Sequence, residues 1–279
     1  VKEAVEDIPI QLTYELRSVP EFVLKTGIIE VSGNYVTMEL GTNMGVKVGD
    51  EYSIVTTRVL STGHEKTEEG GLILVKEVGD EVSTGYVLFS GRKPAVGDQL
   101  KEIPRLGFET SPYVHLIANM ADSSEGDPTF VTAGFRQIFT RGFYGYNPVV
   151  GVEIPINIIG DFGGLFNAWL PLNVYAGAQL NWYLKRIQVS PLAGIGIGMY
   201  IPLNSEGGTD EFGNPQTYDY FVSHFGGLAQ VNLSYLVTRN VKLFAEAGFA
   251  YWLSLRDNFW YSIPSYGGLF GGAGVSIKY

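Results

Sequence analysis

The stretch that decides the fold is residues 241–256, which read VKLFAEAGFAYWLSLR. Its side chains alternate with a period of two, which indicates a β-strand rather than a helix. The odd-numbered positions are all apolar, whereas the even-numbered positions include Lys242, Glu246 and Arg256. One wholly apolar face opposite a mixed polar and glycine face is typical of a membrane barrel, with lipid outside and a narrow lumen inside.

Seven more segments are predicted to be strands of the same barrel. They are residues 112–120, 129–140, 147–156, 170–184, 189–201, 219–237 and 266–279. Eight is an even number, as single-chain bacterial barrels have. Pro191 lies inside one of these segments and predicts a bulge or a strand boundary there, because proline has no N–H for the ladder.

The connections between these segments predict an orientation. Those after the second, fourth and sixth strands are short and basic, whereas most of the others are longer and acidic or aromatic. Barrels of this kind have short periplasmic turns and longer extracellular loops. Both chain ends of the barrel segment are therefore predicted to lie in the periplasm, and the acidic connection 203–218 is predicted to lie outside the cell.

Charge is unevenly distributed along the chain, which has 279 residues, a net charge of −10 and 17% charged residues. About 28 charged side chains fall in residues 1–106 and about 20 in the longer remainder. No apolar run reaches 18 residues, so a transmembrane helix is excluded. The fold class expected is all-β: a small soluble β domain over residues 1–105, then an eight-stranded antiparallel transmembrane barrel over 106–279.

Composition also limits the chemistry. The acidic balance argues against a nucleic-acid partner, which requires a basic face. The absence of cysteine excludes thiol catalysis and cysteine-ligated zinc. The three histidines, His64, His115 and His224, show no metal-binding spacing, and no Gly-x-Ser-x-Gly motif occurs. We therefore expect no enzymatic activity, no cofactor and no metal.

The N-terminal segment reads as short strands at 26–31, 35–40, 51–57, 71–78 and 81–89, separated by turn signals. Gly33-Asn34 suits a tight hairpin. Three Val-Gly-Asp triplets, which end at Asp50, Asp80 and Asp98, are interpreted as capped turns rather than as a cation-binding repeat.

The same segment carries a resemblance through Gly-Ile-Ile-Glu-Val from residue 27, Tyr-Val-Thr-Met-Glu-Leu-Gly from residue 35, and Gly-Val-Lys-Val-Gly-Asp-Glu-Tyr-Ser-Ile from residue 45. Residues 22–103 resemble the C-terminal β domain of flagellar assembly protein T. That resemblance implies a docking or scaffolding role in the periplasm, without catalytic residues.

A second resemblance lies at the C-terminus, which reads Gly-Val-Ser-Ile-Lys-Tyr from residue 274. It is similar to the signal by which outer-membrane proteins are recognised by the barrel assembly machinery, through Gly274, Ile277 and Tyr279. Residues 107–279 as a whole resemble the small eight-stranded outer-membrane barrels. The implied location is the bacterial outer membrane, with membrane lipid and the assembly machinery as partners.

Inward-facing charges are predicted to form a polar network in the lumen. Its members are Arg136, Glu153, Lys242 and Glu246, and Arg136 and Glu153 are expected to pair because they lie on neighbouring strands. Eight strands enclose a space that side chains fill, so a plugged core is favoured over an ion or proton path. Aromatic residues near strand ends predict interfacial anchors, and these are Trp182, Tyr183, Trp252 and Trp260.

The functional hypothesis is a barrel anchor whose periplasmic domain docks onto a protein partner in an envelope assembly. One alternative is an adhesin or ligand-binding barrel that acts through acidic outer loops, and another is a narrow conduit. A soluble, lipocalin-like barrel also competes, in which the apolar faces would point inward.

Overall fold

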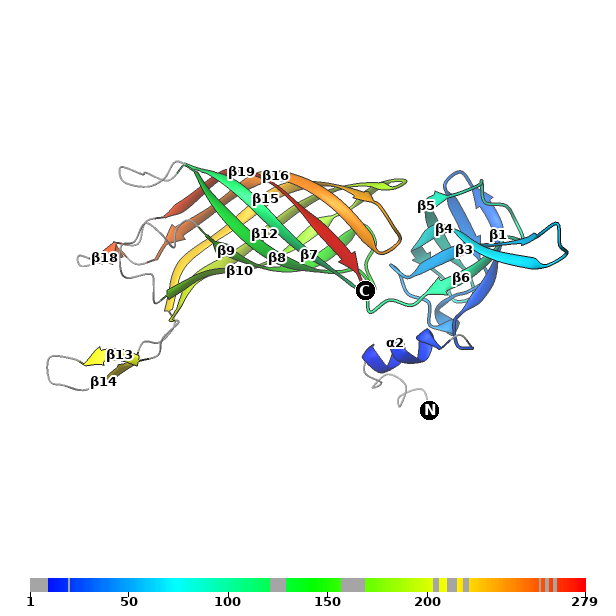
Figure 1. Cartoon of the computed structure of the whole chain (residues 1–279), viewed down its shortest axis with the longest axis horizontal. Coiled ribbons are helices and arrows are strands. Elements are labelled where there is room, and N and C mark those ends of the chain that lie inside the picture. Colours follow the sequence, from blue (N-terminus) through cyan, green and yellow to red (C-terminus); the bar gives the residue numbers. More distant parts are fainter. Residues whose placement is uncertain are drawn as a thin grey trace.

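The computed structural model describes residues 10–19, 21–120, 129–156, 169–202, 206–209, 215–217, 221–255, 257–258, 261–262 and 265–279. Two closed antiparallel sheets follow one another along the chain, and only residues 104–107 join them (Figure 1). Helix α2 (Ile10–Ser18) precedes the first sheet, and the 3-10 turn η1 (Thr42–Met44) lies within it. In the described ranges, no helix is long and apolar enough to cross a membrane.

The N-terminal sheet has six strands in the order β1-β2-β5-β4-β3-β6. Their bounds are β1 (Lys25–Ser32), β2 (Tyr35–Met38), β3 (Glu51–Val59), β4 (Glu65–Val78), β5 (Ser83–Ser90) and β6 (Gln99–Ile103). Its core contains apolar side chains from all six strands, among them Ile28, Ile54 and Ile73. Five strands were predicted, whereas β6 and α2 were missed because neither carries a clear apolar period.

The predicted hairpin and two of the three predicted capped turns of this domain are confirmed, whereas the Asp80 carboxylate accepts from the Thr42 hydroxyl instead. Ser32 pairs with Tyr35, so Gly33-Asn34 forms a two-residue hairpin loop, in which Gly33 has a φ of 61°. Asp50 and Asp98 each accept a hydrogen bond of 2.9 Å from the backbone N–H three residues earlier. These carboxylates therefore cap turns, as interpreted from the sequence.

The C-terminal sheet closes through eight strands, each of which pairs with the next, and β19 pairs with β7. Their bounds are β7 (Phe108–Asn119), β8 (Thr129–Phe139), β9 (Tyr146–Pro155), β10 (Trp169–Leu180), β12 (Ile187–Pro202), β15 (Phe221–Leu236), β16 (Val241–Ser254) and β19 (Tyr266–Lys278). The short strand β11 (Trp182–Leu184) extends the β10–β12 hairpin. The predicted eight-stranded antiparallel barrel is confirmed.

Two small hairpins lie beyond the barrel end that is remote from the N-terminal domain (Figure 1). One pairs β13 (Glu206–Thr209) with β14 (Pro215–Thr217), and the other pairs β17 (Asp257–Asn258) with β18 (Tyr261–Ser262). The short connections β8–β9, β11–β12 and β15–β16 lie at the opposite end, next to the N-terminal domain. The predicted asymmetry of the connections is therefore present.

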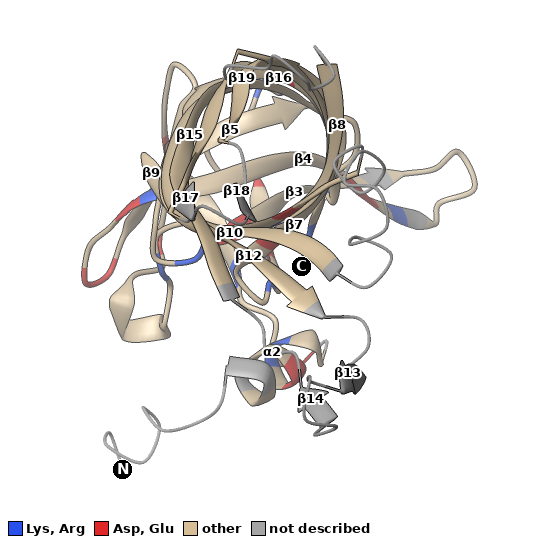
Figure 2. Ribbon diagram, turned by 90° about the vertical axis from the view of Figure 1, so that its left-hand side faces the viewer, with Lys and Arg blue, Asp and Glu red and all other residues tan. Residues whose placement is uncertain are grey.

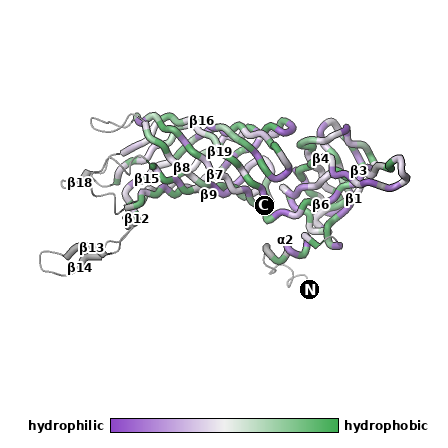
Figure 3. The backbone as a smooth tube through the Cα atoms, viewed as in Figure 1, coloured by the Kyte–Doolittle hydropathy of each residue, from purple (hydrophilic) through white to green (hydrophobic). Residues whose placement is uncertain are grey.

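The apolar faces of the barrel strands point outward. On β16, Leu243 and Leu253 are 51% and 53% exposed, whereas Phe244 and Glu246 are buried. Charged residues are sparse along the barrel wall (Figure 2), and hydrophobic and hydrophilic positions alternate along its strands (Figure 3). This arrangement contradicts a lipocalin-like soluble barrel and defines a membrane-spanning one.

Pro191 neither bulges nor ends its strand. Gln179 pairs with Leu192 and Trp182 pairs with Val189, so the register is the same on both sides of the proline. The ladder is interrupted between these pairs, where β10 ends and β11 begins. Because proline cannot donate a ladder hydrogen bond, the missing N–H produces this interruption without a change of register.

Candidate functional site

The centre of the lumen is organised around one carboxylate, Glu246 on β16. Its Oε2 accepts hydrogen bonds from Arg136 at 2.5 Å, Gln230 at 2.8 Å and Asn232 at 3.0 Å, and its Oε1 lies 2.7 Å from Nε2 of His115. All these side chains are buried. A buried carboxylate requires such compensation, because an unpaired charge in the interior is very costly.

Glu153 on β9 forms a second cluster beside the first. Its Oε1 accepts a hydrogen bond of 2.9 Å from the Tyr113 hydroxyl, which lies 3.0 Å from the Tyr175 hydroxyl. Nδ1 of His115 is 3.6 Å from the same carboxylate oxygen. His115 therefore lies between two carboxylates, and the predicted pairing of Arg136 with Glu153 is wrong. Arg136 reaches across the lumen to Glu246 instead.

Aromatic rings complete the surroundings of Arg136. Its guanidinium carbon lies 4.9 Å from the ring centre of Tyr113 and 4.8 Å from that of Phe244. Nε and Nη1 have no hydrogen-bond partner among the described residues. Cation–π contact with the two ring faces compensates part of that loss, since it strengthens where the cation is desolvated.

Glycines make room for the rings that fill the lumen. A Cβ at Gly134 would collide with the Tyr113 ring, and a Cβ at Gly151 would collide with the Tyr175 ring. The cavity lined by Arg136, Gln179 and Lys242, among others, measures about 10 Å³. That is close to the minimum that a single water molecule needs. The described part of the lumen is therefore a packed polar core, as the sequence predicted.

Lys242 lies apart from the central cluster, near the mouth that faces the N-terminal domain. Its Nζ donates to both oxygens of Glu109, at 2.7 and 2.9 Å, and to Oε1 of Gln188 at 2.9 Å. The predicted four-residue network is thus divided in two. Glu109 was missed because the sequence placed the start of its strand at residue 112.

The N-terminal domain covers this mouth through an apolar contact. Leu72 and Leu74 of β4 form a buried cluster with Tyr86 of β5 and with Leu236 of the barrel. Strand β4 is therefore buried on both faces, because Ile73 and Val75 point into the domain core. The unbroken apolar run 72–75 is the sequence signal that indicates such two-sided burial.

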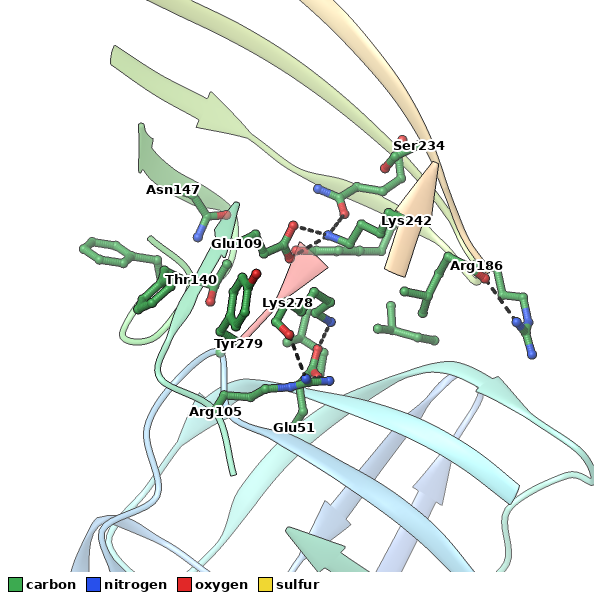
Figure 4. Close-up of a pocket in the computed structure, with 18 of the residues that line it drawn as sticks. Glu51, Arg105, Glu109, Thr140, Asn147, Arg186, Ser234, Lys242, Lys278 and Tyr279 are labelled. Carbon is green, nitrogen blue, oxygen red and sulfur yellow. Dashed lines mark hydrogen bonds and ion pairs between the residues drawn. The ribbon is translucent and has the colours of Figure 1, made fainter. Parts of the chain in front are cut away.

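Ion pairs surround the apolar contact, and we call the two together the junction. Glu51 of β3 accepts a hydrogen bond of 3.0 Å from Nε of Arg105 and another from Nζ of Lys278 (Figure 4). Arg141 in the β8–β9 turn donates to Asp50 at 2.9 Å. The cavity enclosed here measures about 30 Å³, which suits one or two water molecules.

The basic turns of the barrel thus bind the chain's own N-terminal domain. Arg239 in the β15–β16 turn pairs with Glu69 at 2.6 Å, and Arg186 lies 4.0 Å above the ring centre of Phe89. The sequence identified these turns as short and basic but gave no indication of their partners. The acidic residues that pair with these turns belong to a separate domain. The alternation of side chains along a strand does not predict where a second domain docks.

The predicted interfacial aromatics divide into four cases. Trp182 is 60% exposed on the outer face, as expected of an anchor. Tyr183 instead packs at the junction, with its ring centre 6.4 Å from that of Tyr86 and 5.5 Å from that of Tyr144. Trp252 is 1% exposed inside the barrel, because it lies on the inward, even-numbered face of β16. Trp260 lies outside the described residues.

The C-terminal residues of the predicted assembly signal all lie at the β7–β19 pairing. A Cβ at Gly274 would collide with the Phe244 ring, Ile277 pairs with Thr110, and the Tyr279 ring lies 5.6 Å from that of Phe108. Recognition by the assembly machinery stays a prediction. Among the described residues, no cluster of three or more metal-ligating side chains occurs.

These features define the class of protein: an all-β chain with the fold of a small eight-stranded outer-membrane barrel, preceded by a separate six-stranded closed sheet. No protein-family model and no curated protein matches the sequence.

Solved structures that are similar in fold include Neisserial surface protein A, with 15% identity, a TM-score of 0.41, and coverage of 62% of this chain and 97% of that one. Two structures of Ail, the attachment invasion locus protein of Yersinia pestis, have 12% identity, a TM-score of 0.33 and coverage of 61% of this chain. They are covered over 97% and 99% of their own lengths, and the first is a complex with the heparin analogue sucrose octasulfate. The resemblance of residues 22–103 to the flagellar domain stays a prediction.

The junction is expected to resist mild acid. Burial in itself raises the pKa of Glu51, but the nearby charges of Lys278 and Arg105 outweigh it and hold that pKa below its usual value of 4.5. A carboxyl with a lowered folded-state pKa contributes stability above its unfolded pKa and loses it as the pH falls through the folded value. The contribution of Glu51 to docking should therefore be complete above pH 4.5 and be lost as the pH falls below that value.

This expectation can be measured by fluorescence anisotropy of a dye on Val96→Cys, since Val96 is 66% exposed on the N-terminal domain and the chain has no native cysteine. Loosening near neutral pH would contradict it. The variant Glu51→Gln, which has no titrating carboxyl there, should show a weaker acid transition.

Proposed function

We propose that this protein is a membrane-anchored docking module of the bacterial envelope. The barrel holds the chain in the outer membrane, and the N-terminal domain binds a periplasmic protein partner. The observation that carries the proposal is the junction: the domain is fixed to one barrel mouth by buried apolar and ionic contacts, while the lumen behind it is packed. A domain fixed to a barrel whose lumen is filled suits the presentation of a binding surface to a partner better than the transport of a solute.

The orientation follows from the connections. The short turns lie at the same end as the junction, and the longer connections lie at the other end. Because short turns are periplasmic in barrels of this class, we infer that the N-terminal domain is periplasmic. Protease added to intact cells should then leave residues 1–105 uncut, and cleavage there would contradict the orientation.

The N-terminal domain offers a groove for its partner. The groove measures about 700 Å³ and is lined by β1, β6 and the β3–β4 hairpin, with Lys25, Thr57 and Lys101 among its residues. This volume falls within the range of ligand-binding clefts. Its lining mixes apolar side chains and threonines with Lys25 and with an ion pair between Lys101 and Glu69, which suits an extended segment of a protein.

We expect a photo-crosslinking residue at Thr57 to capture a periplasmic protein in living cells, while the same residue at Val82, which is exposed outside the groove lining, captures little or none. Planar-bilayer recordings of the purified protein should show no steady conductance. Equal capture at both positions, or a stable open channel, would contradict the proposal.

A second candidate function is binding at the cell surface. The β13–β14 hairpin extends past the barrel end opposite the junction, and Glu206 lies within it (Figure 1). Such an extension suits an adhesin that acts through its outer loops. Deletion of residues 203–218 should then abolish attachment to a host surface while the folded barrel still forms.

A further inference from the structure

The pairing of the first and last barrel strands, which we call the seam, is weak at one end. The β7–β19 ladder runs from Asn119–Gly268 to Tyr113–Gly274, and resumes with Thr110–Ile277 and Glu109–Lys278. Between these parts Pro112 lies opposite Val275, and proline has no N–H to donate. Beyond the interruption the seam therefore has only these two pairs and the backbone hydrogen bonds of Tyr279 with Phe108, at 3.1 Å, and with Gly107, at 3.3 Å.

Side chains inside the barrel compensate for part of this loss. Ser111 Oγ lies 2.9 Å from Ser276 Oγ, which in turn donates to Oε2 of Glu109 at 3.1 Å. Lys242 of β16 also donates to Glu109. Inside the lumen, next to the interruption, these bonds connect β7 with β19 and with β16, which is the other neighbour of β19.

A second set of bonds reaches the same end of the seam from the N-terminal domain. Arg105 donates to the backbone carbonyl of Lys278 at 3.2 Å, to that of Arg239 at 2.7 Å and to Oδ1 of Asn240 at 3.0 Å. Glu51 accepts from both Arg105 and the Lys278 side chain. Figure 4 shows Glu51 and Arg105 directly beside the end of β19.

We propose that the N-terminal domain is a latch on the barrel seam, with Glu51 and Arg105 as the latch residues. Glu51 belongs to the N-terminal domain, Arg105 precedes the first barrel strand, and Lys278 belongs to the last. The three together hold both ends of the barrel chain at the part of the seam that lies beyond the interruption at Pro112. Loss of the latch lets the periplasmic end of the seam open locally, and this property does not depend on the partner proposed above.

Backbone hydrogen exchange of the full chain in lipid nanodiscs tests the latch. In Glu51→Gln, amides of residues 108–111 and 276–279 should exchange at least about tenfold faster, since loss of the charge-assisted bonds makes local opening of this end more frequent. Amides at the matching end of the β12–β15 hairpin should keep their rates. Phe89→Leu is the matched control, because it removes a different domain–barrel contact, with Arg186 in the β11–β12 turn, on the side of the barrel away from the seam.

Two further variants make the outcome decisive. Arg105→Lys keeps the charge but lacks the planar fork of donors, so it should accelerate the same amides even if Glu51→Gln fails to assemble. Cysteines at Thr110 and Ile277, which face each other across the seam, joined by a short thiol crosslinker, should restore slow exchange in Glu51→Gln. Acceleration spread evenly over all eight strands, or equal acceleration of the seam amides in Phe89→Leu, would overturn the latch.

Discussion

Replacement of Glu246 by glutamine is expected to lower the free energy of unfolding of the barrel by about 3–5 kcal/mol, the range found when one partner of a buried ion pair is removed. Glu246 is the acceptor for Arg136, Gln230 and Asn232 and lies against His115. The amide keeps the shape but not the charge, so Arg136 remains buried without its counter-ion. Urea unfolding of the protein in lipid vesicles, followed by tryptophan fluorescence, measures the change.

A double variant separates the ion pair from simple packing. Arg136→Met with Glu246→Gln removes both charges, retains similar side-chain volume and keeps an acceptor oxygen for Gln230 and Asn232, so no buried charge is left without its partner. It should recover much of the stability that Glu246→Gln loses. A single variant as stable as the wild type would show that the lumen carries water to the charges.

Replacement of Gly151 by alanine is expected to destabilise the barrel by about 1–3 kcal/mol, the usual cost of overpacking. A methyl group at this position would overlap the ring of Tyr175, which is 1% exposed and hydrogen-bonded to Tyr113. The ring has no free space to move into, because the lumen around it is filled. The loss is measured by the same unfolding experiment.

Gly271 offers a matched control on the outer face. A Cβ there meets no atom within 4 Å, so Gly271→Ala should change stability by less than about 1 kcal/mol and in the favourable direction, since glycine weakens strands. Equal losses at the two positions would mean that glycine is needed for backbone freedom rather than for the Tyr175 ring.

The barrel strands were predictable because a period of two marks every lipid-facing side chain. The same alternation says which residues point inward, and Arg136, Glu153, Lys242 and Glu246 are all buried. It does not say how far a side chain reaches. In a lumen this narrow a residue across the barrel is as near as one on the next strand. The pairing of Arg136 with Glu246 therefore could not be read from neighbouring strands.

Two aromatic predictions failed for a related reason. Their position near a strand end suggested membrane anchors. Whether a side chain points inward or outward depends on its even or odd position along the strand, and Trp252 shares the inward face with Glu246. Tyr183 is covered by a domain that precedes the barrel in the chain. The apolar run 72–75 indicates that both faces of β4 are buried, but it does not predict which part of the protein packs against each face.

The link of four residues between the two closed sheets has a further consequence. So short a connection fixes the distance and the orientation of the groove relative to the membrane. Even a few added residues would weaken this constraint, and a flexible insertion there would let the N-terminal domain rotate relative to the barrel. Insertions in the outer loops would leave that geometry untouched, so the tolerance of the chain to length changes should differ sharply between its two ends.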